Sequence, residues 1–275
     1  MKTKYGMSRK SVAGMFVAFL LLMLLPLTAV AVEYTSLATI SRGLTYPTDV
    51  AIAPNGKVFV VDGISRKVLT YDSSYRYLGS FSSVANPVAV AAAPSGALYV
   101  ADNLTKSVKI VNPATGAVTG FLSDTGGTMA TFELPRNIAV GPDGTVYVVD
   151  QFGNSVYVFN SAGVKFDSDT ISGLTMPQDV AASATDLYII DQPRISETNT
   201  GGTTGSGTIN GSRIQIYNLA DGLFDAGAFP PFGNDTDVGE YISLKGVGID
   251  PQNNVYVSDS FLQVVYKYDA DGVFL

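Results

Sequence analysis

A unit of about 40 residues recurs five times along this chain, and the repeat limits the fold more than any other feature. Each copy contains two short apolar runs, of which the second ends in aspartate. The copies of the second run are Val58–Asp62, Leu98–Asp102, Val146–Asp150, Leu187–Asp191 and Val255–Asp259. The copies of the first run are Pro47–Ile52, Pro87–Ala91, Pro135–Ala139, Pro177–Ala181 and the divergent Leu244–Gly248. A repeat of this length indicates one supersecondary unit stacked on its neighbours.

Turn residues divide each unit into four strands. The two runs are joined by segments such as Pro54-Asn55-Gly56, which have the chemistry of tight β-turns. A third strand ends near Tyr71 and a short fourth strand follows at Tyr77–Phe81. A four-stranded antiparallel sheet of this size is a propeller blade. We therefore predict an all-β propeller, with blades at about residues 45–82, 83–122, 132–168, 175–228 and 242–275.

Two columns of the repeat support radial packing of these blades. Small residues recur in the first strand, where the inner strands of a propeller converge: Ala51, Ala91, Ala139, Ala181 and Gly248. Aromatic residues recur in the second strand, where a ring buries a large apolar area between neighbours: Phe59, Tyr99, Tyr147, Tyr188 and Tyr256.

The strand count predicts a six-bladed ring, five blades of which are present in this sequence. Residues 34–44 resemble a fourth strand without a preceding first to third strand, and a further fourth strand begins at Val273. An N-terminal outer strand that completes the last blade would leave one blade to follow Leu275, in which case the C-terminus is truncated. The alternative is a five-bladed ring in which residues 34–44 form a tail.

The five units resemble NHL repeats, a β-propeller family whose blades carry an apolar-aromatic-apolar-x-Asp strand such as Val146–Asp150. The resemblance covers residues 42–275, although the Asn-His-Leu turn of the family is absent. Gluconolactonase-like propellers are a more distant relative. Related propellers include lyases and lactonases that depend on a metal, and others that carry a cysteine-rich RING for ubiquitin ligation.

The N-terminus has the pattern of a secretory signal peptide. Four basic residues precede an apolar run from Val12 to Leu27, and small residues follow up to Ala31. This pattern predicts a signal peptide at residues 1–31 and a mature propeller at 32–275, secreted or held in the periplasm or at the cell surface. The mature protein is not expected to insert into a membrane. The alternative is an uncleaved anchor, which the apolar run is nearly long enough to form.

Cys, His and Trp are missing from the sequence, and these absences exclude several kinds of site. Thiol and Ser-His-Asp catalysis, zinc sites of Cys or His, and disulfides all need residues that are missing. Removing residues 1–31 takes four positive charges and changes the formal net charge from −7 to −11. An acidic surface of this kind argues against nucleic acid as a partner.

Long insertions are all expected on one face of the ring. They follow Asp191, up to Arg213, and Asp225, up to Ser243. The second insertion carries an aromatic and acidic cluster that suits contact with a protein, peptide or glycan: Phe229, Phe232, Asp235, Asp237, Glu240 and Tyr241. The alternative is a loop that projects into solvent without a role.

Polar residues at the start of three first strands are expected around the channel mouth on the same face. Asp49, Asn137 and Asp179 hold equivalent positions, and their oxygens could bind Ca²⁺. The alternative is that these side chains hydrogen-bond a neighbouring blade. A structural role is also expected for the strand-end aspartates, which accept backbone N–H bonds in the turns that follow: Asp62, Asp102, Asp150, Asp191 and Asp259.

These observations favour an exported, non-catalytic scaffold that binds a protein, peptide or glycan through its loop-rich face without a cofactor. The alternative is a calcium-dependent enzyme of the lactonase or lyase kind, with Asp49, Asn137 and Asp179 as ligands.

Overall fold

The computed structural model describes residues 39–192, 212–225, 243–270 and 272–275, all within one compact unit, Ala38–Leu275. These residues form nineteen strands and no helix, so the prediction of an all-β fold is confirmed for them. Nothing in the described ranges provides a helix that could cross a membrane.

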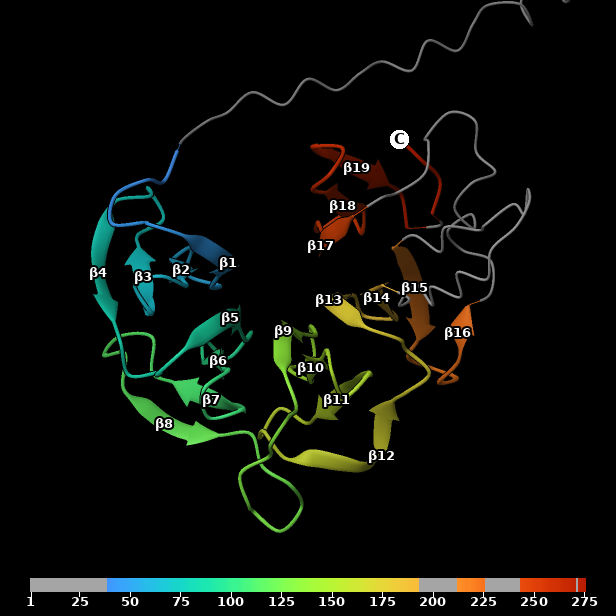
Figure 1. Ribbon diagram of the computed structural model, residues 1–275, viewed down its shortest axis with the longest axis horizontal. Coiled ribbons are helices and arrows are strands. Elements are labelled where there is room, and N and C mark those ends of the chain that lie inside the picture. Colours follow the sequence, from blue (N-terminus) through green and yellow to red (C-terminus); the bar gives the residue numbers. More distant parts are fainter. Residues whose placement is uncertain (1–38, 193–211, 226–242, 271) are drawn as a thin grey trace, which may run out of the picture. The chain divides into compact units, whose positions relative to one another are not determined.

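The strands form five antiparallel sheets, blades 1 to 5 in sequence order, and each blade runs from its inner strand outward (Figure 1). Blade 1 contains β1 (Pro47–Ile52), β2 (Val58–Asp62), β3 (Lys67–Tyr71) and β4 (Tyr77–Phe81). Blade 2 contains β5 (Pro87–Ala92), β6 (Leu98–Asp102), β7 (Ser107–Val111) and β8 (Val118–Phe121). Blade 3 contains β9 (Pro135–Val140), β10 (Val146–Asp150), β11 (Ser155–Phe159) and β12 (Lys165–Ile171).

Blade 4 contains β13 (Pro177–Ala182), β14 (Asp186–Asp191), β15 (Arg213–Asn218) and β16 (Phe224–Asp225). Blade 5 contains β17 (Leu244–Ile249), β18 (Val255–Asp259) and β19 (Val264–Tyr268), with an isolated antiparallel bridge from Tyr268 to Phe274 in the place of a fourth strand. The predicted propeller of antiparallel blades is therefore confirmed.

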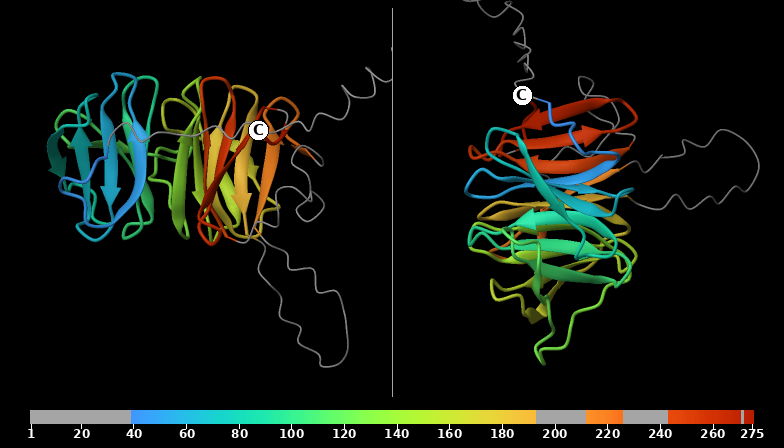
Figure 2. Two further views of the ribbon diagram at one scale, coloured as in Figure 1. Left: turned by 90° about the horizontal axis from the view of Figure 1, so that it is seen from above. Right: turned by 90° about the vertical axis from the view of Figure 1, so that its left-hand side faces the viewer.

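The strands run from one face of the ring to the other, as the edge-on view shows (Figure 2). We call the face on which the inner strands begin the mouth face. Because the strands alternate in direction, each second strand ends on this face and each third strand begins there. The connections between second and third strands, and those between blades, therefore lie on the mouth face.

Apolar side chains between adjacent blades form the core. Each inner strand packs on the next one, from β1 through β5, β9 and β13 to β17. The aromatic column fills the space between blades 1 to 5, with Phe59 0%, Tyr99 3%, Tyr147 4% and Tyr188 2% exposed. Burial of one ring per interface explains why an aromatic residue recurs at this position.

The outer faces of blades 1 and 5 are not covered by another blade within the described residues. In the last strand of blade 5, Val265 is 66% exposed, whereas its equivalents Val68, Val108 and Val156 are at most 1% exposed. In β1, Val50 and Ile52 are 57% and 67% exposed. Figure 1 shows these two blades standing apart, unlike every other neighbouring pair.

The expected fourth strand at residues 34–44 is not formed by its described part. Residues 39–44 turn instead, with Leu44 N–H donating to the carbonyl oxygen of Ser41 at 3.2 Å and Gly43 at a φ of +83°. The phenol of Tyr71 holds this turn by donating to the carbonyl oxygen of Arg42 at 2.7 Å. Ile40 and Leu44 thereby pack on Tyr71 and its neighbours without strand pairing. Residues 34–38 lie outside the described residues.

Candidate binding site at the channel mouth

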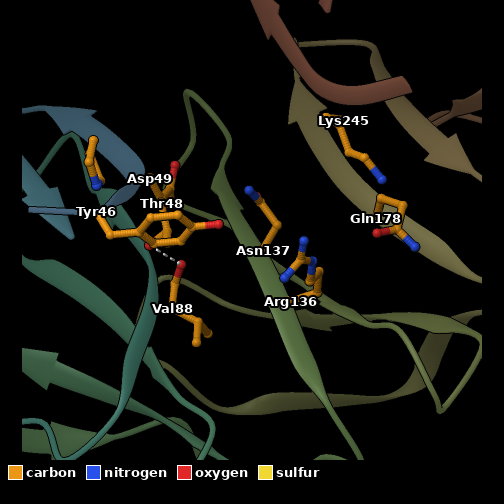
Figure 3. A pocket seen from close by; sticks show the side chains of 9 residues that line it. Tyr46, Thr48, Asp49, Val88, Arg136, Asn137, Gln178 and Lys245 are labelled. Carbon is orange, nitrogen blue, oxygen red and sulfur yellow. Dashed lines mark hydrogen bonds between the residues drawn. The ribbon is translucent and has the colours of Figure 1, made fainter. Parts of the chain in front are cut away.

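A cavity of about 330 Å³ opens on the mouth face, where the five inner strands begin. Figure 3 shows Arg136, Gln178 and Lys245 on one side of it and Tyr46, Thr48 and Asp49 on the other. Pro47, Val88 and Asn137 complete the lining, so all five blades contribute. Its volume is at the lower end of the range for small-molecule sites.

One β-bulge in each inner strand supplies most of this lining. In blade 1, Pro47 pairs with Asp62 and Asp49 pairs with Val61, so that Thr48 is skipped by the ladder. The same shift occurs in the other four blades. A bulge re-aims the side chain of the extra residue. The skipped residues are Thr48, Val88, Arg136, Gln178 and Lys245, and every one of them lines the cavity.

The strand-end aspartates hold the segments that enter these bulges. Asp150 is 1% exposed and accepts the backbone N–H groups of Glu133 at 2.7 Å, Leu134 at 2.8 Å and Gly153 at 3.1 Å. Two of these donors precede β9 and the third lies in the turn after β10. Corresponding bonds to backbone N–H groups ahead of the inner strand are made by Asp62, Asp102, Asp191 and Asp259. One carboxylate in each blade thus fixes where the inner strand starts.

Asp191 differs from the others in its second set of partners. Its Oδ2 accepts bonds from the Arg213 guanidinium at 2.7 Å and from Gln215 Nε2 at 2.8 Å. The buried carboxylate therefore ties together the two ends of the long connection in blade 4.

Asp49 and Asp179 link neighbouring blades. Asp49 Oδ2 accepts the backbone N–H of Val90 in β5 at 2.8 Å, and Oδ1 accepts that of Val50. Asp179 Oδ2 accepts the N–H of Val247 in β17 at 2.8 Å, and Oδ1 accepts that of Val180. Each carboxylate thus bonds the inner strand of the next blade. Asn137 holds the corresponding position in β9 and faces the cavity.

Burial raises the pKa values of both carboxyl groups. The pKa of Asp49 is raised to about 6 by burial, against the lowering effect of its backbone bonds and of Arg136. Burial raises the pKa of Asp179 to about 8, and the charge of Asp49 adds to this shift, while Arg136 opposes it. At neutral pH the Asp179 carboxyl therefore carries little negative charge.

This donor set fits Ca²⁺ poorly. All four oxygens of Asp49 and Asp179 accept backbone N–H bonds, and the cations Arg136 and Lys245 share the cavity. A calcium site needs several oxygens turned toward one point. The described residues contain no group of three Asp, Glu, His or Cys side chains placed for a metal ion.

Two cations face the cavity without a partner carboxylate. The ion pairs among the described residues are Arg76 with Asp72 and Arg213 with Asp191, so neither Arg136 nor Lys245 belongs to one. Both side chains are exposed. The sequence-based hypothesis did not include Arg136, Lys245 or Gln178. Arg136 and Gln178 each lie between the first proline of an inner strand and a polar residue, and this position could have identified them. Lys245 lies between Leu244 and Gly246 and has no such signal.

Exposed apolar side chains recur around the mouth face. They lie two residues after the strand-end aspartate, in the turns between second and third strands. Their exposed fractions are 66% for Ile64, 67% for Leu104, 51% for Phe152 and 68% for Phe261, and we call these four the rim residues. These four side chains give the mouth face one large exposed apolar residue in each of four blades. The corresponding residue of blade 4 lies outside the described residues.

The predicted loop cluster also lies outside the described residues: Phe229, Phe232, Asp235, Asp237, Glu240 and Tyr241. The described ends of the blade 4 connection do reach the mouth face. Gln192 Nε2 donates to the carbonyl oxygen of Leu244 at 3.0 Å, and Ser212 Oγ accepts the Leu244 N–H at 3.2 Å. Both contacts are adjacent to Lys245.

No protein-family model and no curated protein matches the sequence. Solved structures of other β-propellers do match. Hydrazine synthase from Kuenenia stuttgartiensis has a TM-score of 0.58 at 16% identity over 87% of this chain and 81% of that one. A gluconolactonase from Xanthomonas campestris has a TM-score of 0.57 at 17% identity over 84% and 75%. A protein of unknown function from Bacteroides caccae has a TM-score of 0.53 at 14% identity over 86% and 82%.

The protein is a β-propeller. At these identities the matches show the fold alone.

Proposed function

We propose that this propeller is an exported, non-catalytic scaffold that holds a protein, peptide or glycan at its mouth face. One observation carries the proposal. Five bulges, one in each blade, place Thr48, Val88, Arg136, Gln178 and Lys245 around a single cavity. Arg136 and Lys245 are exposed and belong to no ion pair among the described residues, so their charges are accessible to a ligand. The exposed rim residues around the cavity add apolar contact area.

A binding role is favoured over catalysis by the chemistry of the cavity. The sequence has no His or Cys, and the carboxylates of Asp49 and Asp179 are engaged by backbone N–H groups. The likeness to a gluconolactonase rests on fold, and the donor set does not fit the calcium ion that the alternative function requires.

A filled cavity tests the role of the mouth face. Thr48 is exposed, lines the cavity at its bulge and donates its hydroxyl to the carbonyl oxygen of Val88. Thr119 is also exposed and donates to the carbonyl oxygen of Ile110, but it lies in the outer strand of blade 2, away from the cavity. We expect Thr48→Trp to abolish binding to peptide and glycan arrays and Thr119→Trp to leave it unchanged, with equal melting temperatures for both. Binding that survives Thr48→Trp places the ligand elsewhere and refutes the proposal.

We further propose that the ring has six blade positions and that its blades are of the NHL type. The exposed Val265, Val50 and Ile52 occupy faces that a neighbouring blade covers everywhere else. The sequence has no cysteine, so a thiol introduced by Val265→Cys reports on this face alone. In protein isolated from the organism that makes it, we expect maleimide to label Val265→Cys as slowly as Val156→Cys. Rapid labelling of the first alone contradicts a covered face.

Export is proposed from the N-terminal pattern. N-terminal sequencing of the protein recovered from outside the cytoplasm is expected to begin at Val32, whereas a sequence that begins at Met1 contradicts signal cleavage.

A further inference from the structure

We propose that the cavity binds a carboxylate group of a protein or peptide, held by Arg136 and Lys245, while apolar residues of the same peptide rest on the rim residues. The inference rests on the proposed binding function and specifies its ligand. The carboxylate comes from an Asp or Glu side chain or from the free C-terminus of the peptide.

The charge of the cavity favours a monoanion. Arg136 and Lys245 contribute two positive charges, and Asp49 opposes them from the other side (Figure 3). Asp179, which follows Gln178 in β13, is only partly ionised at neutral pH because burial raises its pKa to about 8. One positive charge is then in excess. A carboxylate neutralises it, whereas a doubly charged phosphate would leave an excess negative charge beside Asp49.

The shape and hydrogen-bonding groups of the cavity also suit a carboxylate. The planar guanidinium of Arg136 presents paired N–H donors that match the two oxygens of such a group. The amides of Asn137 and Gln178 add donors beside it. Gln178 is 6% exposed, and its Nε2 donates to the carbonyl oxygen of Met176 at 3.2 Å, which fixes the orientation of the side chain.

The rim residues favour a peptide over a glycan. Two of the four are aliphatic, Ile64 and Leu104, and aliphatic side chains pack on apolar peptide side chains better than on sugar hydroxyls. The rim lies between the second and third strands, about one to two strand spacings of 4.7–4.9 Å outside the inner strand. An extended peptide rises about 3.3 Å per residue. An acidic residue in the cavity therefore places neighbours about one to three positions away over the rim.

The test uses peptide arrays in which every sequence is made in three forms. One form has a central Glu and an amidated end, the second has Gln in its place, and the third has Gln with a free C-terminal carboxylate. We expect the purified protein to bind the first or third form at least tenfold more tightly than the second. The form that binds identifies the source of the carboxylate.

Charge-removing variants connect this preference to the cavity. Arg136→Gln and Lys245→Gln are each expected to lower the affinity for the carboxylate peptide at least tenfold. The affinity for its Gln counterpart is expected to stay unchanged. Lys57→Gln, which removes the same charge at the β1–β2 turn on the opposite face, is the matched control and is expected to have no effect. Equal melting temperatures show that the variants remain folded.

The pH dependence adds an independent readout. Between pH 5 and 9 the cavity loses positive charge in two steps, because the pKa of Asp49 is raised to about 6 and that of Asp179 to about 8. Affinity for the Glu peptide is expected to fall over this range, and affinity for its Gln counterpart to stay level.

Four results would overturn the inference. Peptides that bind equally in all three forms, or that respond alike to Arg136→Gln and Lys57→Gln, refute the carboxylate site but leave the scaffold function intact. Binding of a uronate oligosaccharide without any peptide refutes the peptide ligand and again leaves that function intact. Absence of any binding by the wild-type protein refutes both.

Discussion

The substitution Asp150→Ala should destabilise the propeller more than replacement of an exposed aspartate by alanine. The Asp150 carboxylate is 1% exposed and accepts three backbone N–H bonds, from Glu133, Leu134 and Gly153. These bonds connect the end of β10 to the segment that enters β9. Loss of the acceptor leaves three donors to find water in a partly buried turn.

The magnitude follows from the bond count. A hydrogen bond to a charged group contributes about 1.5–3 kcal/mol, and a typical net bond contributes about 1 kcal/mol. Because Glu133 is exposed and can be rehydrated, we take about 1 kcal/mol for each bond, or about 3 kcal/mol in all. A domain of this size loses about 2–4 °C of melting temperature per kcal/mol. The expected decrease for Asp150→Ala is therefore about 6–12 °C.

Two further variants separate the bonds from the loss of charge. Oδ1 of Asp150 accepts two of the three bonds and Oδ2 accepts the one from Glu133, so Asp150→Asn should retain two bonds. Its melting temperature should therefore decrease by about a third as much as that of Asp150→Ala. Asp143→Ala is the control, since this exposed aspartate accepts bonds only within its own turn, from the N–H and Oγ1 of Thr145. Thermal unfolding followed by circular dichroism gives all three values. If Asp150→Ala and Asp143→Ala melt alike, the strand-end aspartates do not hold the blades.

Two other perturbations have expected outcomes. The free energy of unfolding should fall as pH rises from about 4 to about 8, because folding raises the pKa of Asp179 from 3.8 to about 8 and the folded state then binds more protons than the unfolded state. Asp179→Asn should flatten this slope in urea titrations, and an unchanged slope would assign it to other groups. Gly116→Ala should cost about 2–4 kcal/mol, because its φ of +70° disfavours a side chain and an added Cβ would overlap Phe81 of blade 1. Gly96→Ala, at a φ of +88° with open space around it, should cost only about 1 kcal/mol in the same urea experiment.

The repeat was sufficient to predict the strands that the structure contains. The second strands were predicted within one residue, because apolar-aromatic alternation ending in Asp leaves little freedom of register, as in Val146–Asp150. The prediction of a fourth strand at residues 34–44 was wrong for the described residues, 39–44. Its apolar residues do contact blade 1, but the turn at Gly43 replaces strand pairing with side-chain packing. Hydrophobicity alone does not distinguish these two ways of covering a sheet.

The site was only partly predictable, because a β-bulge shifts a strand by one residue. Without the bulge, strict alternation would place Asp49 and Thr48 on opposite faces of β1, and the sequence gives no direct signal that the ladder skips Thr48. The polar ring at Asp49, Asn137 and Asp179 was therefore noticed, while the residue before each of them was not. The structure shows Asp49 and Asp179 bonding the next blade, and it places Arg136 in the cavity.

The repeat also provides an internal test of which positions serve structure and which face a ligand. At the strand end the same residue, aspartate, occurs in all five blades, because the same backbone donors must be satisfied each time. At the bulge the backbone geometry is equally uniform, yet the five residues differ in size and charge: Thr48, Val88, Arg136, Gln178 and Lys245. Because the bulge has the same backbone geometry in all five blades and yet accepts dissimilar side chains, the fold does not require one particular residue at this position. The dissimilarity instead places both cations, Arg136 and Lys245, on one side of the cavity, opposite Asp49, and this asymmetry is the reason for proposing a ligand that carries a negative charge at one end.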